Sequence, residues 1–176
     1  MQRSKSKSHA SDLVFKIRRF RPVDLGRVTN VIREVYPPKP RRWALATFRY
    51  HVRHQQAGIA DGRTFFLVET NGNIVGVFGT HTHIWGPPDI AWASWFFVAK
   101  RFHRSRYALR VAELFFARLQ SSHIRRLYVE TYSAHPDYSL IAGILPKIGF
   151  VLEARLLNYV QSGVDMLYFA KDISRL

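Results

Sequence analysis

The stretch IAWASWFFVAKRFHRSRYALRVAELFFARLQ, residues 90–120, contains the features that decide the fold. Its first part, IAWASWFFVAK (90–100), is strongly apolar and predicts one long strand. Its last part, from Tyr107 to about Leu119, has the apolar spacing of an amphipathic helix. Arginines and a lysine crowd the loop between them. The centre of the chain is therefore predicted to be a strand that passes through a basic loop into a helix.

Upstream of this unit the sequence predicts a strand and two helices. LVFKIRRF (13–20) alternates apolar and basic residues, as a half-buried strand does. A helical pattern from Asp24 to Val35 ends at a cluster of prolines, and a second helix-like stretch runs to about residue 56. Residues 1–12 show no apolar period, so we expect a flexible basic tail there and the domain proper at 13–176.

A hairpin and a C-terminal group of elements complete the prediction. TFFLVET (64–70) and IVGVFGTHTHIW (74–85) are predicted strands, joined by the strong turn signal Asn71-Gly72-Asn73. RLYVETY (126–132) is a further strand, a partly helical stretch follows from Tyr138, and two strands end the chain. This order predicts a single α/β (α+β) domain, whose mixed, mostly antiparallel sheet carries helices on both faces.

Length and composition exclude several classes of protein. The chain has 176 residues, 47% of them hydrophobic, which fits one domain with a real core and excludes wholesale disorder. It has no apolar run of about eighteen residues, so we expect no membrane span and a cytoplasmic location. It has no cysteine, which excludes disulfides, thiolate metal sites and cysteine nucleophiles.

Charge is the unusual property of the composition. Lys and Arg number 27 against 12 Asp and Glu, for a formal net charge of +15. Such a balance favours polyanionic partners, namely nucleic acid, an acidic membrane or a phosphate-rich cofactor. The cations concentrate near the N-terminus and in residues 100–110. The second concentration lies in the loop that links the central strand to its helix.

Three segments resemble the GNAT superfamily of acyl-CoA-dependent N-acetyltransferases. WFFVAKRFHRSRYAL (95–109) is similar to the family's strand, loop and helix start, written V-x-P-x-x-[RQ]-x-x-G-x-[GA]. ILPKIGF (144–150) resembles its L-Y-E-K-L-G-F segment, and LLNYVQSGVDMLYFAKDI resembles its last two strands. The order of elements agrees over residues 14–173. The resemblance implies the acyl-CoA N-acyltransferase fold and acetyl-CoA as co-substrate.

The resemblance also implies where the cofactor binds, although the loop departs from the motif. His103 stands at the [RQ] position and Arg106 at the first glycine, and only Ala108 conforms. Cationic side chains would then replace part of the backbone cradle for the pyrophosphate. The alternative is a basic surface that no longer binds CoA. The cofactor-binding residues implied are Phe96, Phe97, Val98, His103, Arg104, Ser105, Arg106, Tyr107 and Ala108.

A catalytic acid is not supplied by the usual position. The family's tyrosine, which protonates the leaving thiolate, aligns with Leu145 here. Tyr138 is our candidate instead, because it begins the helix expected to flank the thiol, and Tyr132 and Tyr159 are alternatives. For each tyrosine the competing interpretation is an ordinary half-buried core residue.

Candidates for a general base lie on the predicted strands. His81 and His83 alternate along one strand, Asp89 begins the central strand, and Glu69 and Glu130 lie within strands. An ordinary partly exposed strand position is the competing interpretation for the histidines. His81 and His83 could also hold a metal, but no third ligand has a convincing spacing, so no metal site is expected.

The sequence predicts an N-acetyltransferase that moves an acetyl group from acetyl-CoA to a primary amine of a small molecule or peptide. Repulsion disfavours a strongly cationic acceptor unless the cleft itself is acidic. Two other functions stay open on the same scaffold: a basic module that binds nucleic acid or the ribosome, and a sensor that binds acyl-CoA without turnover. A homodimer is also left open, and no membrane partner is expected.

Overall fold

The computed structural model describes residues 14–103, 106–135 and 138–173. The predicted tail, residues 1–12, lies outside the described residues. The strands are β1 Lys16–Arg19, β2 Arg63–Thr70, β3 Asn73–His81, β4 Ile90–Ala93, β5 Phe97–Val98, β6 Arg126–Tyr132, β7 Val151–Gln161 and β8 Val164–Asp172. The helices are α1 Leu25–Val35, α2 Pro38–Gln56, α3 Arg106–Gln120 and α4 Tyr138–Ile144, with short 3-10 turns η1 Pro22–Asp24, η2 Lys100–Phe102 and η3 Pro146–Ile148.

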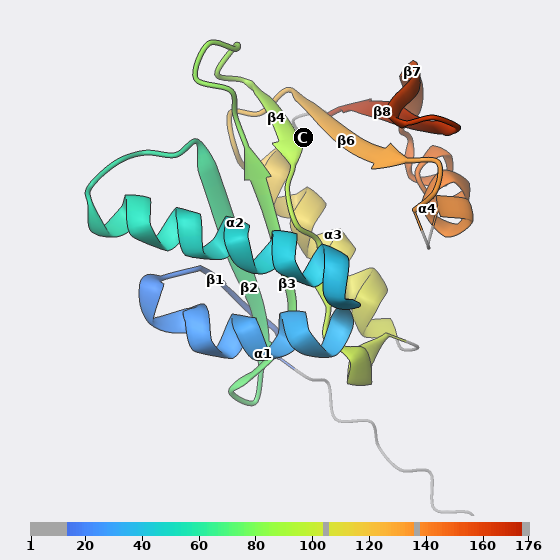
Figure 1. The fold of residues 1–176 in the computed structure, drawn as a ribbon. Coiled ribbons are helices and arrows are strands. Elements are labelled where there is room, and N and C mark those ends of the chain that lie inside the picture. Colours follow the sequence, from blue (N-terminus) through green and yellow to red (C-terminus); the bar gives the residue numbers. More distant parts are fainter. Residues whose placement is uncertain (1–13, 104–105, 136–137, 174–176) are drawn as a thin grey trace, which may run out of the picture.

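All strands belong to one sheet of order β1-β2-β3-β4-β6-β8-β7, with β5 paired to β3 (Figure 1). β4 and β6 run parallel, and the other neighbouring pairs run antiparallel. The predicted mixed, mostly antiparallel sheet is therefore confirmed. Asn71 and Gly72 both have positive φ, 48° and 72°, as a two-residue hairpin turn between β2 and β3 requires.

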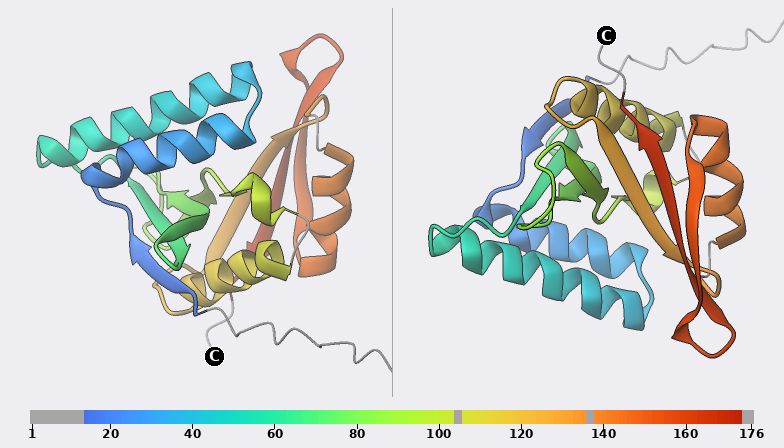
Figure 2. Two further views of the ribbon diagram at one scale, coloured as in Figure 1. Left: turned by 90° about the horizontal axis from the view of Figure 1, so that it is seen from below. Right: turned by 90° about the horizontal axis from the view of Figure 1, so that it is seen from above.

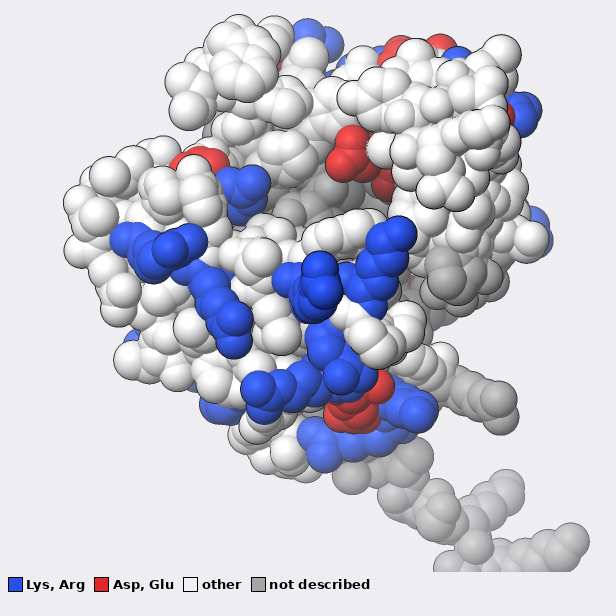
Figure 3. All heavy atoms as spheres, viewed as in Figure 1, with Lys and Arg blue, Asp and Glu red and all other residues white. Residues whose placement is uncertain are grey.

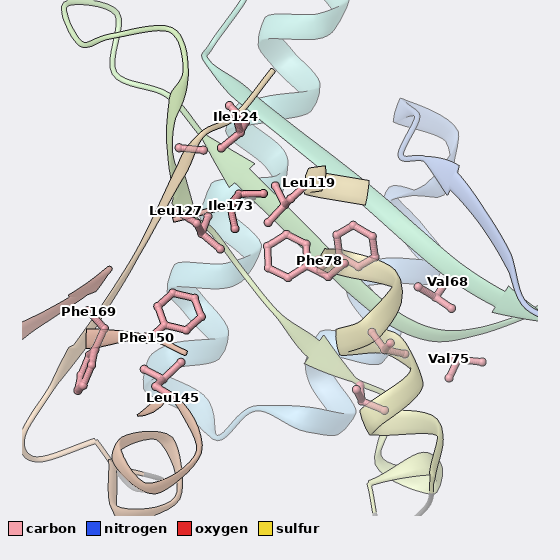
Figure 4. Close-up of a cluster of buried hydrophobic side chains, with 14 of the residues drawn as sticks. Val68, Val75, Phe78, Leu119, Ile124, Leu127, Leu145, Phe150, Phe169 and Ile173 are labelled. Carbon is pink, nitrogen blue, oxygen red and sulfur yellow. The ribbon is translucent and has the colours of Figure 1, made fainter. Parts of the chain in front are cut away.

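Helices cover both faces of the sheet (Figure 2). On one face, α1 and α2 bury Ile32 and Phe48 against β2, β3 and β5. On the other face, α3 packs with β6, β8 and the segment around α4, and Figure 4 shows this second core. Phe78, Leu119 and Phe169 belong to it. No described helix is long and apolar enough to cross a membrane.

Two predicted strands differ from the observed ones. The stretch 90–100 forms two short strands, β4 and β5, rather than one long strand, because the chain leaves the ladder between Ala93 and Phe97. The strand predicted at 74–85 ends at His81, so His83 lies in the turn that follows. The proline cluster ends α1 as predicted and also begins α2, whose first residue is Pro38.

Candidate active site

The sheet opens between β5 and β6. β4 pairs with β6 through three rungs, the last of which joins Trp92 to Tyr128. Beyond that rung β5 stays on β3, whereas β6 stays on β8 as far as Tyr132. The two halves of the sheet therefore diverge (Figure 1). Backbone groups on the facing edges lack a strand partner there, and an extended polar ligand could satisfy them.

A β-bulge lies at the start of this opening. β3 has two residues between Val77 and Thr80, while the facing chain has three between Ala93 and Phe97, so one residue is extra. The amide of Ser94 donates to the carbonyl of Gly79 at 2.9 Å. The next two amides, those of residues 95 and 96, have no backbone acceptor among the described residues. The bulge thus leaves hydrogen-bond donors beside the opening.

The three strand residues expected to bind the cofactor, Phe96, Phe97 and Val98, do not all direct their backbone groups to the same side of the strand. The Ala99 amide donates to Val75 at 2.8 Å, so the next hydrogen-bonded rung is Val77 with Phe97. The backbone N–H and C=O of Phe97 therefore bond to β3. The backbone N–H and C=O groups of Phe96 and Val98 point away from β3, toward the opening. The Phe96 carbonyl accepts a hydrogen bond from the Tyr36 hydroxyl at 3.4 Å.

The basic loop follows directly. The His103 Nε2–H donates to the Val98 carbonyl at 2.6 Å, which ties the loop to the end of β5. Arg104 and Ser105 lie outside the described residues, as does the side chain of Arg106. The ring of Tyr107 packs against Phe15 and Phe102, with centroids 5.6 and 5.3 Å away, and Ala108 packs on the core. Among the described groups, the backbone N–H groups of this helix start are suited to bind an anion.

An aromatic wall covers the face of the sheet beside the opening. Strand register brings Trp92 next to His81 and Tyr128, and Glu130 next to Tyr168. The Trp92 ring stacks on Tyr128 at 4.7 Å and meets Tyr168 edge-on at 5.7 Å. Because α1 and α2 pack on β2, β3 and β5, this part of the face is not covered by them. Figure 3 shows a hollow here, with acidic atoms in its wall.

The titratable groups of this wall influence one another. Burial lowers the pKa of His81 to about 4, with the positive charge of Arg63 and the neighbouring His83 acting in the same direction. Burial raises the pKa of the Glu130 carboxyl, and His83 partly opposes this. Burial, followed by the charge of Glu130, raises the pKa of Tyr168. A carboxyl whose charged form is disfavoured is suited to taking up a proton.

The structure brings some predicted catalytic residues together and separates others. His81 and His83 lie 5.4 Å apart by ring centroid and belong to the aromatic wall, because both contact Trp92. Asp89 lies at the closed end of the β4–β6 junction, where it is ion-paired with Arg125 at 2.6 Å. It does not join the wall.

Tyr138 is the first residue of α4 and packs against the core on the α3 side of the sheet. Tyr138 therefore lies on the face of the sheet opposite to the aromatic wall. No three His, Asp or Glu side chains gather as a metal site within residues 14–103, 106–135 and 138–173.

A family model described as "Acetyltransferase (GNAT) family" matches residues 28–138. The chain belongs to the GNAT acetyltransferase family. No curated protein matches it. The matched segment of this GNAT protein runs from α1 to the first residue of α4, and so contains the opening, the basic loop and most of the aromatic wall.

Solved structures share the fold of this GNAT protein at low sequence identity. A protein assigned to the GNAT acetyltransferases of Desulfovibrio desulfuricans is 18% identical, with a TM-score of 0.76 over 92% of this chain and 100% of that one. The ribosomal-protein-S18-alanine N-acetyltransferase of Escherichia coli is 17% identical, with a TM-score of 0.67 over 93% and 96%. PaiA N-acetyltransferase of Thermoplasma acidophilum, in complex with coenzyme A, is 13% identical, with a TM-score of 0.64 over 91% and 99%.

The sequence alone does not single out the residues that the fold gathers in the wall. Glu130 is one of several base candidates on predicted strands, and Trp92, Tyr128 and Tyr168 belong to apolar strand patterns. Residues 128, 130 and 132 alternate on one side of a strand, which is the signal that could have found them. Their meeting with Trp92 and Tyr168 depends on strand register, which the sequence does not display.

Proposed function

We propose that this GNAT protein transfers an acetyl group from acetyl-CoA to a primary amine of a small molecule or peptide. The observation that carries the proposal is the divergence of β5 from β6, with bulge amides along it and a titratable, aromatic wall beside it. The coenzyme A complex of one structural neighbour supports the choice of donor. The donor would enter from the α3 side and the acceptor from the wall side.

The residues present fit acetyl-CoA as the donor. The backbone N–H groups of Phe96 and Val98 would bind the pantetheine arm, because they face away from β3 while the two carbonyls already accept from Tyr36 and His103. The N-terminus of α3, a helix of 15 residues, would bind the pyrophosphate together with Arg104, Ser105 and Arg106. His103 would act through its bond to Val98, which fixes the loop. Tyr107 and Ala108 would serve by packing, and Phe97 by anchoring β5.

Among the titratable groups of the aromatic wall, Glu130 is the best suited to act as general base. In the reaction the amine nitrogen bonds to the acetyl carbon, the C–S bond breaks, the base takes the amine proton, and an acid protonates the thiolate. Partial desolvation by the neighbouring side chains raises the pKa of Glu130, although the residue is exposed, and a raised pKa suits a general base. His81, with a pKa of about 4, would be the weaker base, and Asp89 already pairs with Arg125. His83 would tune Glu130, and Tyr138 would be the acid.

The wall also suggests which amines fit. Aromatic faces attract an ammonium group, and Glu130 supplies a negative charge beside them. An amine carried on an apolar or aromatic group would therefore suit the wall better than a polyamine, which the many surface cations repel. The activity of the E. coli neighbour on an alanine of a ribosomal protein keeps peptide N-termini among the candidates.

Thermal unfolding with and without acetyl-CoA tests the donor, with ATP and a short oligonucleotide as polyanion controls. A ligand at about 100 times its Kd adds roughly 2.7 kcal/mol, which is several degrees for a domain of this size. A rise in Tm well above both controls is expected. Equal rises that vanish with salt would contradict the proposal. Transfer to a panel of amines, measured by CoA release, then separates an enzyme from an acyl-CoA sensor.

A further inference from the structure

The exposed face of α2 carries cations and aromatic rings in a regular pattern. Its inner face is buried through Ala44, Phe48, His51 and Val52. The outer positions follow helical spacing of three and four residues, so they share one face of the helix. The residues of this outer stripe are Lys39, Arg42, Trp43, Arg49, Tyr50 and Arg53.

The cations of the stripe have no ion-pair partner in the described part of the chain. The helix PKPRRWALATFRYHVRHQQ contains no Asp or Glu. None of its four exposed cations forms an ion pair with a residue that the structure describes, whereas Arg18 and Arg27 of neighbouring elements both pair with Glu69. Figure 3 shows Lys and Arg side chains gathered over α1 and α2. An external polyanion would neutralise them.

Two large rings stand among these cations. Trp43 is 48% exposed and Tyr50 is 41% exposed. They are seven residues apart, which is two helical turns, or about 10 Å along the same side of α2. The Lys39 ammonium lies 5.5 Å from the Trp43 ring centre. The Tyr50 ring already packs on the His54 ring, with centroids 3.9 Å apart, and lies 5.3 Å from the Arg63 guanidinium, so a base that stacks on Tyr50 would displace one of these two groups. Exposed rings beside cations are the combination that binds unpaired bases together with their phosphates.

We propose that the outer stripe of α2 binds a single-stranded nucleic acid. Lys39, Arg42, Arg49 and Arg53 bind successive phosphates, and Trp43 and Tyr50 stack on bases. From Lys39 to Arg53 the helix rises about 21 Å, which suits a site of about four nucleotides. This function is separate from acetyl transfer and does not depend on it.

Other polyanions fit the stripe less well. A membrane-surface helix inserts an apolar face between lipids, but the apolar face of α2 is already buried in the core through Phe48 and Val52. An acidic peptide would use the cations and leave the exposed ring of Trp43 without a role.

The stripe lies close to the opening between β5 and β6. Tyr36, two residues before α2, donates a hydrogen bond from its hydroxyl to the Phe96 carbonyl at this opening.

Fluorescence anisotropy with a labelled 12-nucleotide oligouridine RNA tests this site in the full chain. The variant Arg42→Gln/Arg49→Gln/Arg53→Gln removes three charges from the stripe. The matched control, Arg3→Gln/Lys5→Gln/Lys7→Gln, removes three from the N-terminus. We expect the stripe variant to lose at least about tenfold in affinity and its log–log salt slope to become shallower by about 2. The control should lose less than about threefold.

A second variant tests stacking separately from charge. Trp43→Ala/Tyr50→Ala keeps every charge, and we expect it to bind the RNA about tenfold more weakly with an unchanged salt slope. Equal losses in the two charge variants, or no loss in the stacking variant, would overturn the proposal. So would binding of anionic phospholipid vesicles as tight as that of RNA at equal phosphate. The Tm of each variant without ligand reports its folding, so the test does not depend on acetyl-CoA binding and leaves the proposed transferase function independently testable.

Discussion

The indole of Trp92 stacks on the ring of Tyr128, with centroids 4.7 Å apart, at the last rung that joins β4 to β6. The two residues therefore mark the point where the sheet stops being continuous. Their rings close the end of the opening and, on the same face, form the floor of the aromatic wall. One contact thus serves both the fold and the candidate acceptor site.

Removing this contact should affect stability as well as acceptor binding. We expect Trp92→Ala to lower the free energy of unfolding by about 1–3 kcal/mol, because a large ring leaves a stack of three aromatic groups. Trp85→Ala is the matched control, since Trp85 is 85% exposed, and its effect should stay within about 0.5 kcal/mol. Urea unfolding measures both variants, and equal costs would contradict the structural role given to Trp92.

Glu130→Gln should remove the proposed base while leaving the fold intact. We expect kcat to fall about 100-fold or more, in the usual range for a general base. In the wild type the rate should fall as pH drops through the raised pKa of Glu130, and this acidic limb should disappear in the variant. The measurement is a pH–rate profile of acetyl transfer for both proteins.

Measurements of thermal stability distinguish a catalytic role of Glu130 from a structural one. Because the folded-state pKa of Glu130 is raised, folding favours its neutral form, and the charged form opposes folding above that pKa. The Tm of Glu130→Gln at neutral pH should therefore equal or exceed that of the wild type. Asp89→Asn, at the ion pair with Arg125, should keep nearly full activity. Loss of activity in Asp89→Asn but not in Glu130→Gln would assign the base to Asp89 instead.

The sequence predicts the local elements and the mixed sheet with helices on both faces, but neither the strand register nor the break within the central strand. The strand at 126–132 and the turn at Asn71-Gly72 were predicted as they are observed, because period-2 alternation and positive-φ residues are local signals. The break between β4 and β5 is not evident from the sequence, since the stretch from Ala93 to Phe97 is apolar except for Ser94 and carries no turn signal. A bulge exists when one strand has one more residue than the strand paired with it. The pairing of β4 and β5 with β3 is therefore needed to recognise it.

The candidate site was predictable in the same uneven way. The place of the basic loop, between the central strand and α3, follows directly from the order of elements. The relation of Glu130 to Tyr168 and of Trp92 to Tyr128 depends on pairings between residues 36 or more positions apart. Burial then sets the pKa values of His81 and Glu130, and a sequence does not state burial residue by residue.

His81 should make the protein less stable as the pH falls from 6.5 toward 4. Its folded-state pKa of about 4 lies below the ordinary value of 6.5, so the unfolded chain binds about one more proton between these limits. Stability therefore rises with pH in this window and is lost on acidification. His81→Gln, which does not titrate, should show a shallower dependence of Tm on pH between 5 and 6.5. An NMR titration that finds the His81 pKa near 6.5 would contradict the burial described here.

Gly79 is a position where a side chain has no room. A Cβ added to it would lie 2.2 Å from the ring of Phe65, which is itself fully buried among Phe20 and Phe48 and cannot move aside. We expect Gly79→Ala to cost about 1–3 kcal/mol of unfolding free energy, as overpacking of a core does. Gly143→Ala, in α4, is the matched control, because no atom lies within 4 Å of its added Cβ. Since alanine favours a helix over glycine by up to about 1 kcal/mol, this variant should be unchanged or slightly more stable. Thermal or urea unfolding measures the stability of the two variants. A Gly79→Ala protein as stable as the wild type would show that the Phe65 ring can move aside despite its burial.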